Sequence, residues 1–497
     1  MANLKSLAKD TAIYGLSSII GRFLNYLLVP LYTTVIVAES GGYGIVSNLY
    51  AYTALFLVLL TFGMETTLFR FSNKEGEDAD KVYGTALWMV LLVGIVFLAL
   101  VFALLKPISQ AMGYAEHPEY IGCFAVITAL DAFQAIMFAR LRQQHRPVKF
   151  MALKMSFIIL SILLNLFVFL VMPRMFGSFP VLKDIYERFN YGVGLIFFIN
   201  LFCTAVVTLG FIPELKGLTF GFDKALAKRM LRYSWPLLLL GLVGILNQVC
   251  DKILYPYLVP GKEGMVQLGI YGACAKIALI MSLLTQAFRY AYEPFVFAGS
   301  RDKNSPEMLA AGMKYFIIFT LLAFLAVMFY LPILKYFVGR TYWEGLKVIP
   351  IVMMAEIFMG IYFNLSFWYK LTDQTWWGAI MSGIGAAVMI AVNVIFVPRI
   401  GYMACAWGGF AGYGTAMLLS YFIGQKKFPI QYALKDILVY TILALALFAV
   451  SQIISQHVSS VVALIINTAL FAVYLFYLIR KDLPLSSIPV INRFVKK

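Results

Sequence analysis

Long apolar stretches separated by short polar loops run through nearly the whole chain. Each stretch has about the 20 residues that an α-helix needs to cross a hydrocarbon core about 30 Å thick. The pattern therefore predicts about fourteen transmembrane helices with very little chain outside the bilayer. The expected spans are 11–36, 43–64, 82–105, 119–140, 150–172, 191–212, 234–257, 268–291, 312–335, 346–369, 376–397, 403–424, 436–456 and 459–479.

The composition indicates helices that contact lipid and one another. Hydrophobic residues make up 62% of the chain and charged residues only 13%, whereas a soluble domain carries about 25% charged residues. The runs are apolar on all sides and lack the alternation that is typical of an outer-membrane barrel. We therefore predict an all-α integral membrane fold. The run 11–36 has no small-residue cleavage site, so we expect it to remain as the first helix rather than act as a signal peptide.

Lysine and arginine residues are distributed unequally between alternate loops. If the N-terminus is cytoplasmic, the cytoplasmic loops and helix ends hold about three times as many of them as the outer ones. This asymmetry predicts cytoplasmic N- and C-termini. Membrane topology and contact with anionic lipids account for the net charge of +16 better than nucleic-acid binding does.

Three segments between the apolar runs carry structural signals. Asp223 is suited to cap a short amphipathic helix over 223–233 at the inner membrane interface. Ser305, followed by Pro and Glu, predicts the start of another helix. The longest outer loop, 173–190, is shorter than the outer domain of a membrane glycosyltransferase or polymerase, which weighs against those enzymes.

The two halves of the chain resemble each other at an offset of about 225 residues. Tyr43–Ile45 opens the second span as Leu268–Gly272 opens the eighth, and Pro30 matches Pro256 near the ends of spans one and seven. Six spans per repeat return the chain to the same side, so the repeats are parallel and related by a pseudo-twofold axis along the membrane normal. Such repeats are typical of transporters, whose substrate site lies between the lobes. The expected parts are an N-lobe (1–212), a cytoplasmic linker (213–233), a C-lobe (234–425), and two further helices with a basic tail (426–497).

The first span contains an intramembrane arginine. Arg22 lies about ten residues into the run, hence about 15 Å deep, and Asn25 shares its face. A charge at this depth costs at least about 2.5–3.5 kcal/mol, so it is either paired with an acid such as Asp131 or Glu356 or serves as an anion contact. The span has no acid after its start, which favours a substrate with a negative group over a cationic drug.

Spans seven and eight place three charges at a similar depth. Asp251 and Lys252 lie near the outer end of span seven, and Lys276 lies in span eight. The residues leave open whether Asp251 pairs with Lys252 or with Lys276. Either pair leaves a positive surplus, so we expect Lys252 and Lys276 to contact an anionic substrate.

The remaining candidates are two acids and two arginines. Asp131 and Glu356 are expected either to pair with cations or to bind a coupling ion, H⁺ or Na⁺. Arg140 and Arg289 lie at inner helix ends, where they are either solvated or attract a phosphate group. The five cysteines and three histidines form no metal-binding spacing. We therefore expect no metal, no other cofactor and no catalytic residue.

Several local sequences are similar to one transporter family. Tyr14–Arg22 followed by Val29–Thr33, together with Tyr43–Ile45 and Tyr233–Leu237, resembles the polysaccharide-biosynthesis flippases of the multidrug/oligosaccharidyl-lipid/polysaccharide (MOP) superfamily. The resemblance implies two six-helix lobes that alternate between inward- and outward-open states. It implies movement of undecaprenyl-pyrophosphate-linked oligosaccharide from the inner to the outer leaflet of a bacterial plasma membrane. Membrane lipids and polysaccharide polymerase machinery are the implied partners.

Three alternatives stay open at this point. Relatives that flip the peptidoglycan precursor lipid II also have fourteen spans and an arginine in the first helix, as Arg22 is here. A cation-coupled small-molecule antiporter is disfavoured because the first span lacks an acid. A membrane enzyme acting on lipid-linked sugars is disfavoured because no metal-ligand cluster, paired carboxylates in an outer loop, or nucleotide-phosphate loop is recognisable.

Overall fold

Every regular element in the described part of the chain is helical. The computed structural model describes residue 24 and residues 26–189, 192–215, 222–299 and 305–482. The elements from α2 to α11 are α2 (Leu28–Val35), η1 (Ala38–Ser40), α3 (Gly42–Thr61), α4 (Met64–Ser72), α5 (Ala79–Ala103), α6 (Leu105–Ala111), α7 (Pro118–Gln143), α8 (Pro147–Leu166), η2 (Phe167–Val171), η3 (Met172–Met175), α9 (Pro180–Arg188), α10 (Val193–Gly210) and α11 (Ile212–Leu215). The later elements are α12 (Lys224–Leu258), α13 (Lys262–Ala278), α14 (Ile280–Gly299), α15 (Ser305–Phe329), α16 (Leu331–Leu334), η4 (Lys335–Phe337), η5 (Arg340–Val348), α17 (Ile349–Leu365), α18 (Phe367–Leu371), α19 (Trp376–Ile400), α20 (Met403–Lys427), α21 (Leu434–Ser455) and α22 (Ser460–Lys481).

The all-α membrane fold predicted from the sequence is confirmed. Within the described residues, eleven helices are long and apolar enough to cross a membrane, or up to twelve if the bent pair α13–α14 forms one span. The 25-residue helix α20 covers the whole predicted span 403–424 without being among these candidates. Most of the predicted span 11–36 lies outside the described residues. The count of fourteen therefore stays a prediction.

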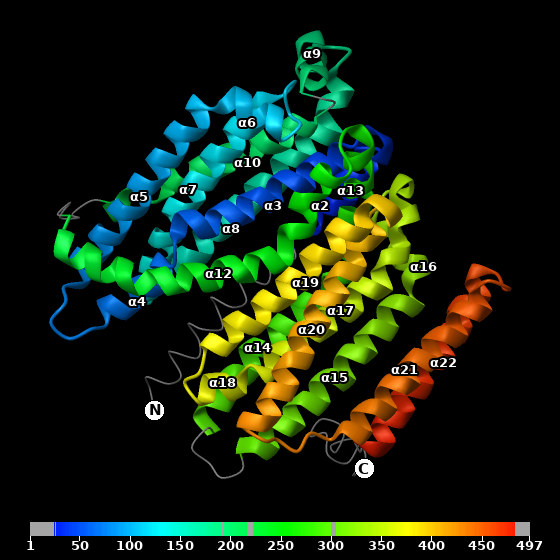
Figure 1. The fold of residues 1–497 in the computed structure, drawn as a ribbon. Coiled ribbons are helices and arrows are strands. Elements are labelled where there is room, and N and C mark those ends of the chain that lie inside the picture. The colour runs from blue at the N-terminus through cyan, green and yellow to red at the C-terminus, as the bar shows by residue number, and fades with distance from the viewer. Residues whose placement is uncertain (1–23, 25, 190–191, 216–221, 300–304, 483–497) are drawn as a thin grey trace, which may run out of the picture. The chain divides into compact units, whose positions relative to one another are not determined.

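The chain forms two compact units. The first contains the described residues up to Lys276 together with 339–345 and 386–408, and the second contains the remaining described residues. In the first unit, α7 packs against α3, α5, α8 and α10, and α8 also packs against α10, as Figure 1 shows. In the second unit, α15 packs against α14, α17, α21 and α22. The lobe boundaries inferred from the repeat stay predictions.

Helix α12 is longer than the sequence pattern indicated. Asp223 caps it as expected, because its Oδ1 accepts hydrogen bonds from the backbone N–H groups of Ala225 (2.9 Å) and Leu226 (3.0 Å). Instead of a separate short helix over 223–233, one helix continues past Pro236 into the membrane span. Leu226 and Met230 are buried in the apolar core of the first unit. This packing and the tolerance of proline in membrane helices account for the continuous helix.

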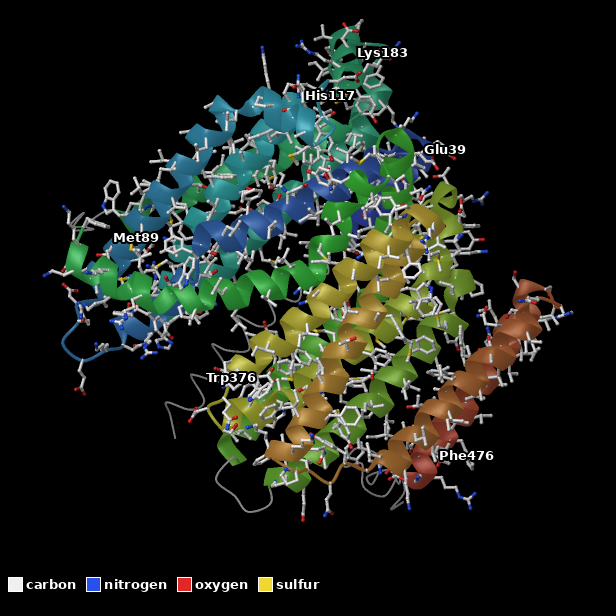
Figure 2. The ribbon with its side chains drawn as sticks, viewed as in Figure 1. Glu39, Met89, His117, Lys183, Trp376 and Phe476 are labelled. Atoms are coloured by element: carbon white, nitrogen blue, oxygen red, sulfur yellow. The ribbon has the colours of Figure 1, made fainter. Side chains whose placement is uncertain are left out.

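The predicted loop 173–190 also contains a helix. Helix α9 occupies Pro180–Arg188, with Pro180 at a position that favours helix initiation. Figure 2 shows Lys183 on this helix, pointing away from the body of the first unit. Lys183 and Glu187 form an i,i+4 ion pair of 3.8 Å.

A polar network fixes the C-terminal helix pair to the second unit. Lys314 Nζ on α15 donates to Asp436 of α21 (2.8 Å) and to Asp482, which follows α22 (2.5 Å). Tyr440 donates its hydroxyl to the second oxygen of Asp482 (2.6 Å), and Lys481 donates to Asp436 (2.8 Å). Two cations and two carboxylates thus neutralise one another where three helices meet. Predicted spans 13 and 14 are therefore attached to α15 rather than isolated in lipid.

Two glycines that the repeat makes equivalent lie against each other. A Cβ atom on Gly44 of α3 would stand 1.9 Å from the carbonyl oxygen of Met265 and 3.1 Å from the nitrogen of Gly269 on α13. A Cβ atom on Gly272 would likewise stand 2.6 Å from Oγ of Ser47. Small residues allow membrane helices to approach this closely. Contact between residues separated by the repeat offset is the self-complementary arrangement expected at a twofold axis.

We predict that Gly44→Ala separates α3 from α13. The added methyl group has no space, and overpacking of this kind costs about 1–3 kcal/mol. The readout is Cys274 on α13, which is buried and whose Sγ lies 3.2 Å from the carbonyl oxygen of Tyr342. Labelling of Cys274 by a polar thiol reagent, followed by peptide mass spectrometry, should become several-fold faster.

Gly244→Ala is the matched control, since Gly244 also lies in a membrane helix and a Cβ there meets nothing within 4 Å. Its Cys274 should react at the wild-type rate. Unchanged Cys274 labelling in folded Gly44→Ala protein would contradict the tight helix contact.

Candidate functional site

Asp251 lies at the centre of a hydrogen-bonded group on α12 and α13. Its side chain is 8% exposed and forms an ion pair with Lys252 (Nζ to Oδ1, 3.1 Å). Tyr271 donates its hydroxyl to Oδ2 (2.7 Å), and the backbone N–H of Lys252 donates to Oδ1 (2.8 Å). Of the two pairs that the sequence left open, the structure therefore contains Asp251–Lys252. With these partners Asp251 is a structural counter-ion in this state.

Side chains from α3 and from the segments that precede α2 and α7 hold the backbones of both lysines. Asn48 donates its amide to the carbonyl oxygen of Lys252 (2.7 Å), and Tyr114 orients Asn48 by donating to its Oδ1 (2.7 Å). Tyr26 donates its hydroxyl to the carbonyl oxygen of Lys276 (2.6 Å). The bonds from Asn48 to Lys252 and from Tyr26 to Lys276 connect parts of the chain that are 204 and 250 residues apart. The two lysines are therefore held by the packed part of the first unit.

Lys276 carries the positive surplus of this group. Its side chain is half-buried on α13, and among the described residues no acid lies within ion-pair distance of its ammonium group. Lys252 lies close enough for the two positive charges to interact. With one acid for two cations, the group of Asp251, Lys252 and Lys276 has a net charge of +1. An unpaired charge between membrane helices is costly unless water or an anion solvates it.

Arg140 lies in a separate belt of ion pairs at one end of the first unit. It pairs with Asp80 and lies 4.9 Å above the ring of Tyr83. In the same belt, Arg142 pairs with Glu65 at 2.7 Å. The structure thus provides Arg140 with a carboxylate partner and places it on α7, away from the group on α12 and α13. Its role as a phosphate contact stays a prediction.

Glu214 on α11 binds two further cations of this belt. Arg146 lies 2.8 Å from one of its oxygens, and Lys149 contacts the other. Burial alone would raise the pKa of Glu214, but Lys149 and Arg146 outweigh it and hold that pKa below its usual value. Glu214 is therefore ionised near neutral pH and carries one negative charge for the two cations beside it.

Arg289 belongs to a smaller basic group in the second unit. Glu293, one turn later on α14, accepts from its Nε (3.2 Å) and also from Nζ of Lys370 on α18 (3.2 Å). Both cationic groups lie 4.5 Å from the ring centre of Phe363. One carboxylate is thus shared by two cations, so this group also has a net charge of +1.

The other predicted residues are distributed over both units. Asp131 is half-buried on α7, within electrostatic reach of Lys154 on α8. Glu356 is half-buried on α17 of the second unit. Arg22 and Asn25 lie outside the described residues. Within the described part of the chain, no group of three or more His, Cys, Asp or Glu residues could hold a metal ion.

Sequence reasoning missed Tyr271 and Lys370. Tyr271 lies twenty residues after Asp251, at the start of a predicted span, where a tyrosine is usually an interfacial residue. Lys370 directly follows the aromatic run Phe367–Tyr369. A cation next to aromatic residues at a helix end could have indicated a cation–π site. The spacing of residues along the sequence does not indicate that Tyr271 contacts Asp251 or that Lys370 contacts Glu293.

Comparison with known proteins identifies the family. The profile of the family described as polysaccharide biosynthesis protein matches residues 7–291, more than half of the chain. No curated protein sequence matches significantly. The family resemblance read from the sequence is therefore confirmed.

Solved structures show the same fold at low sequence identity. The lipid II flippase MurJ in an inward closed conformation has a TM-score of 0.71 and 16% identity, covering 94% of this chain and 98% of its own. An inward-facing multidrug resistance MATE family transporter has a TM-score of 0.64 and 14% identity, covering 81% and 93%. A MOP superfamily transporter from Pyrococcus furiosus has a TM-score of 0.54 and 15% identity, covering 84% and 95%. The chain belongs to the polysaccharide biosynthesis protein family and has the fold of the MOP superfamily structures.

Proposed function

We propose that this protein is a flippase that moves undecaprenyl-pyrophosphate-linked oligosaccharide from the inner to the outer leaflet of a bacterial plasma membrane. The observation that carries the proposal is Lys276, a cation within a membrane helix that no described acid neutralises, next to the Asp251–Lys252 pair. Membership of the polysaccharide biosynthesis family supports the substrate class. The MurJ- and MATE-like fold supports a transporter.

The fixed cations replace the water that a diphosphate loses when it leaves the membrane surface. A bare phosphate in hydrocarbon would cost many kcal/mol, whereas fixed cations such as Lys252 and Lys276, together with water, offset that cost. Arg22 stays a predicted further contact. The prenyl chain stays in lipid, so only the headgroup requires a polar path. No bond is made or broken, and no catalytic residue is required.

We propose that the glycine contact between α3 and α13 closes one side of the substrate path. The predicted topology places this contact on the outer side of the membrane. Release of the substrate requires Gly44 and Gly269 to separate. The two states must differ in affinity for the diphosphate if transport is to be coupled to an ion. Asp131, Asp251 and Glu356 are the proposed acids for coupling to H⁺ or Na⁺.

Depletion of the protein in its native host tests the substrate. We expect a polyprenyl-pyrophosphate-linked oligosaccharide to accumulate, measured by mass spectrometry of extracted lipids. Accumulation of lipid II would instead assign the protein to the peptidoglycan branch. If no lipid intermediate changes, the proposal is wrong and a small-molecule antiporter becomes the better account.

Lys276→Gln should abolish rescue of the depleted host while the protein still inserts in the membrane. The amide has a similar size but lacks the charge that solvates the diphosphate. Lys262→Gln is the matched control, because Lys262 lies exposed at the start of the same helix, and it should rescue fully. Full rescue by Lys276→Gln would remove Lys276 from the substrate path.

A further inference from the structure

Arg289 and Lys370 converge on a single carboxylate in the second unit. Glu293 lies 3.2 Å from each cation and uses a different oxygen for each. The side chain of Arg289 is 50% exposed, whereas those of Lys370 and Glu293 are 23% and 28% exposed. The group is therefore accessible from outside the protein, and its charge is only half neutralised.

Two phenylalanine rings contact the cationic groups of Arg289 and Lys370. The guanidinium of Arg289 and the ammonium of Lys370 each lie 4.5 Å from the ring centre of Phe363. The ring of Phe367, which is almost fully buried, lies 5.2 Å from the same ammonium. Cation–π contacts of this kind attract a cation to the face of an aromatic ring. The two cationic groups are thus held in place by rings as well as by Glu293.

The donors that remain match a phosphate group. Among the described residues, Glu293 takes only the Nε–H of Arg289, which leaves the outer edge of the guanidinium available. A guanidinium edge binds two phosphate oxygens at once, and an adjacent ammonium adds a point charge. A diphosphate carries more charge and more acceptor oxygens than one carboxylate. It would therefore displace Glu293 from both cations.

We propose that Arg289 and Lys370 form a phosphate-binding site in which Glu293 is an exchangeable internal counter-ion. This inference rests on the proposed function for its substrate, the diphosphate of the lipid-linked oligosaccharide. The same chemistry would recognise the phosphate of an anionic lipid headgroup. Glu293 keeps the cations positioned when the site is empty and competes with the incoming phosphate, so it lowers affinity and favours release.

Binding of inorganic pyrophosphate to the purified full chain tests the site. Isothermal titration in detergent at low salt should show that Lys370→Gln weakens binding about tenfold, the loss of one charge-assisted hydrogen bond. Glu293→Gln removes the competing charge and should tighten binding several-fold. Lys370→Arg, which keeps the charge, should restore most of the affinity.

Glu187→Gln is the matched control, since Glu187 forms an i,i+4 ion pair with Lys183 on α9. It should leave the affinity unchanged. If Glu293→Gln binds pyrophosphate no tighter than wild type, Glu293 is not a competing counter-ion. If Lys370→Gln binds as wild type does, the site is wrong even when every variant folds.

A second experiment, with lipid, distinguishes a lipid headgroup from the diphosphate of the substrate as the occupant of the site. Native mass spectrometry in nanodiscs containing phosphatidylglycerol measures how much of this lipid wild type and Lys370→Gln retain. Retention that depends on Lys370 and resists added pyrophosphate supports the phosphate site with a headgroup as its occupant. If added pyrophosphate abolishes the retention of phosphatidylglycerol, the result supports a diphosphate as the occupant of the site. If neither anion depends on Lys370, the inference is overturned.

The site and the proposed function can fail separately. Titration with inorganic pyrophosphate does not depend on which lipid the protein carries. Affinities that change as expected, in a protein whose depletion alters no lipid intermediate, would retain the site and reject the flippase. The reverse combination would retain the flippase and reject this site.

Discussion

Positive charge between membrane helices is the constraint on which this structure depends. A lysine inside the bilayer must be paired, hydrated or in contact with an anion, because the apolar phase does not solvate it. Asp251 neutralises Lys252 and leaves Lys276 in excess. In the second unit, Glu293 faces both Arg289 and Lys370. Both groups therefore have fewer carboxylates than cations.

The surplus cations contrast with the polar network that attaches the C-terminal helix pair. Lys314 and Lys481 meet Asp436 and Asp482, so that network has as many acids as bases. Equal numbers of positive and negative charges suit a structural role, and this network attaches α21 and α22 to α15. An unbalanced group is costly to keep and is more easily explained by a mobile anion. The difference in charge balance thus distinguishes this structural network from the groups around Lys276 and Glu293.

Hydropathy predicted most of the fold, because the bilayer demands long apolar helices. It could not predict that α12 continues past Pro236, since that depends on how Leu226 and Met230 pack against other helices. The repeat offset made Gly44 and Gly269 equivalent, but only the structure shows that they are in contact. The sequence also identified Asp251, Lys252 and Lys276, whereas their pairing depends on Tyr271 and on helix rotation. Lys370 was missed because its partner lies 77 residues away in the chain.

Transbilayer movement in a purified system tests the central claim most directly. The full chain would be reconstituted into liposomes with a fluorescent undecaprenyl-pyrophosphate-linked oligosaccharide, and the sugar would be probed with an impermeant lectin. The account predicts rapid conversion of lectin-inaccessible substrate to accessible substrate in protein-containing liposomes and slow conversion in empty ones. Equal rates with and without correctly folded protein would contradict it.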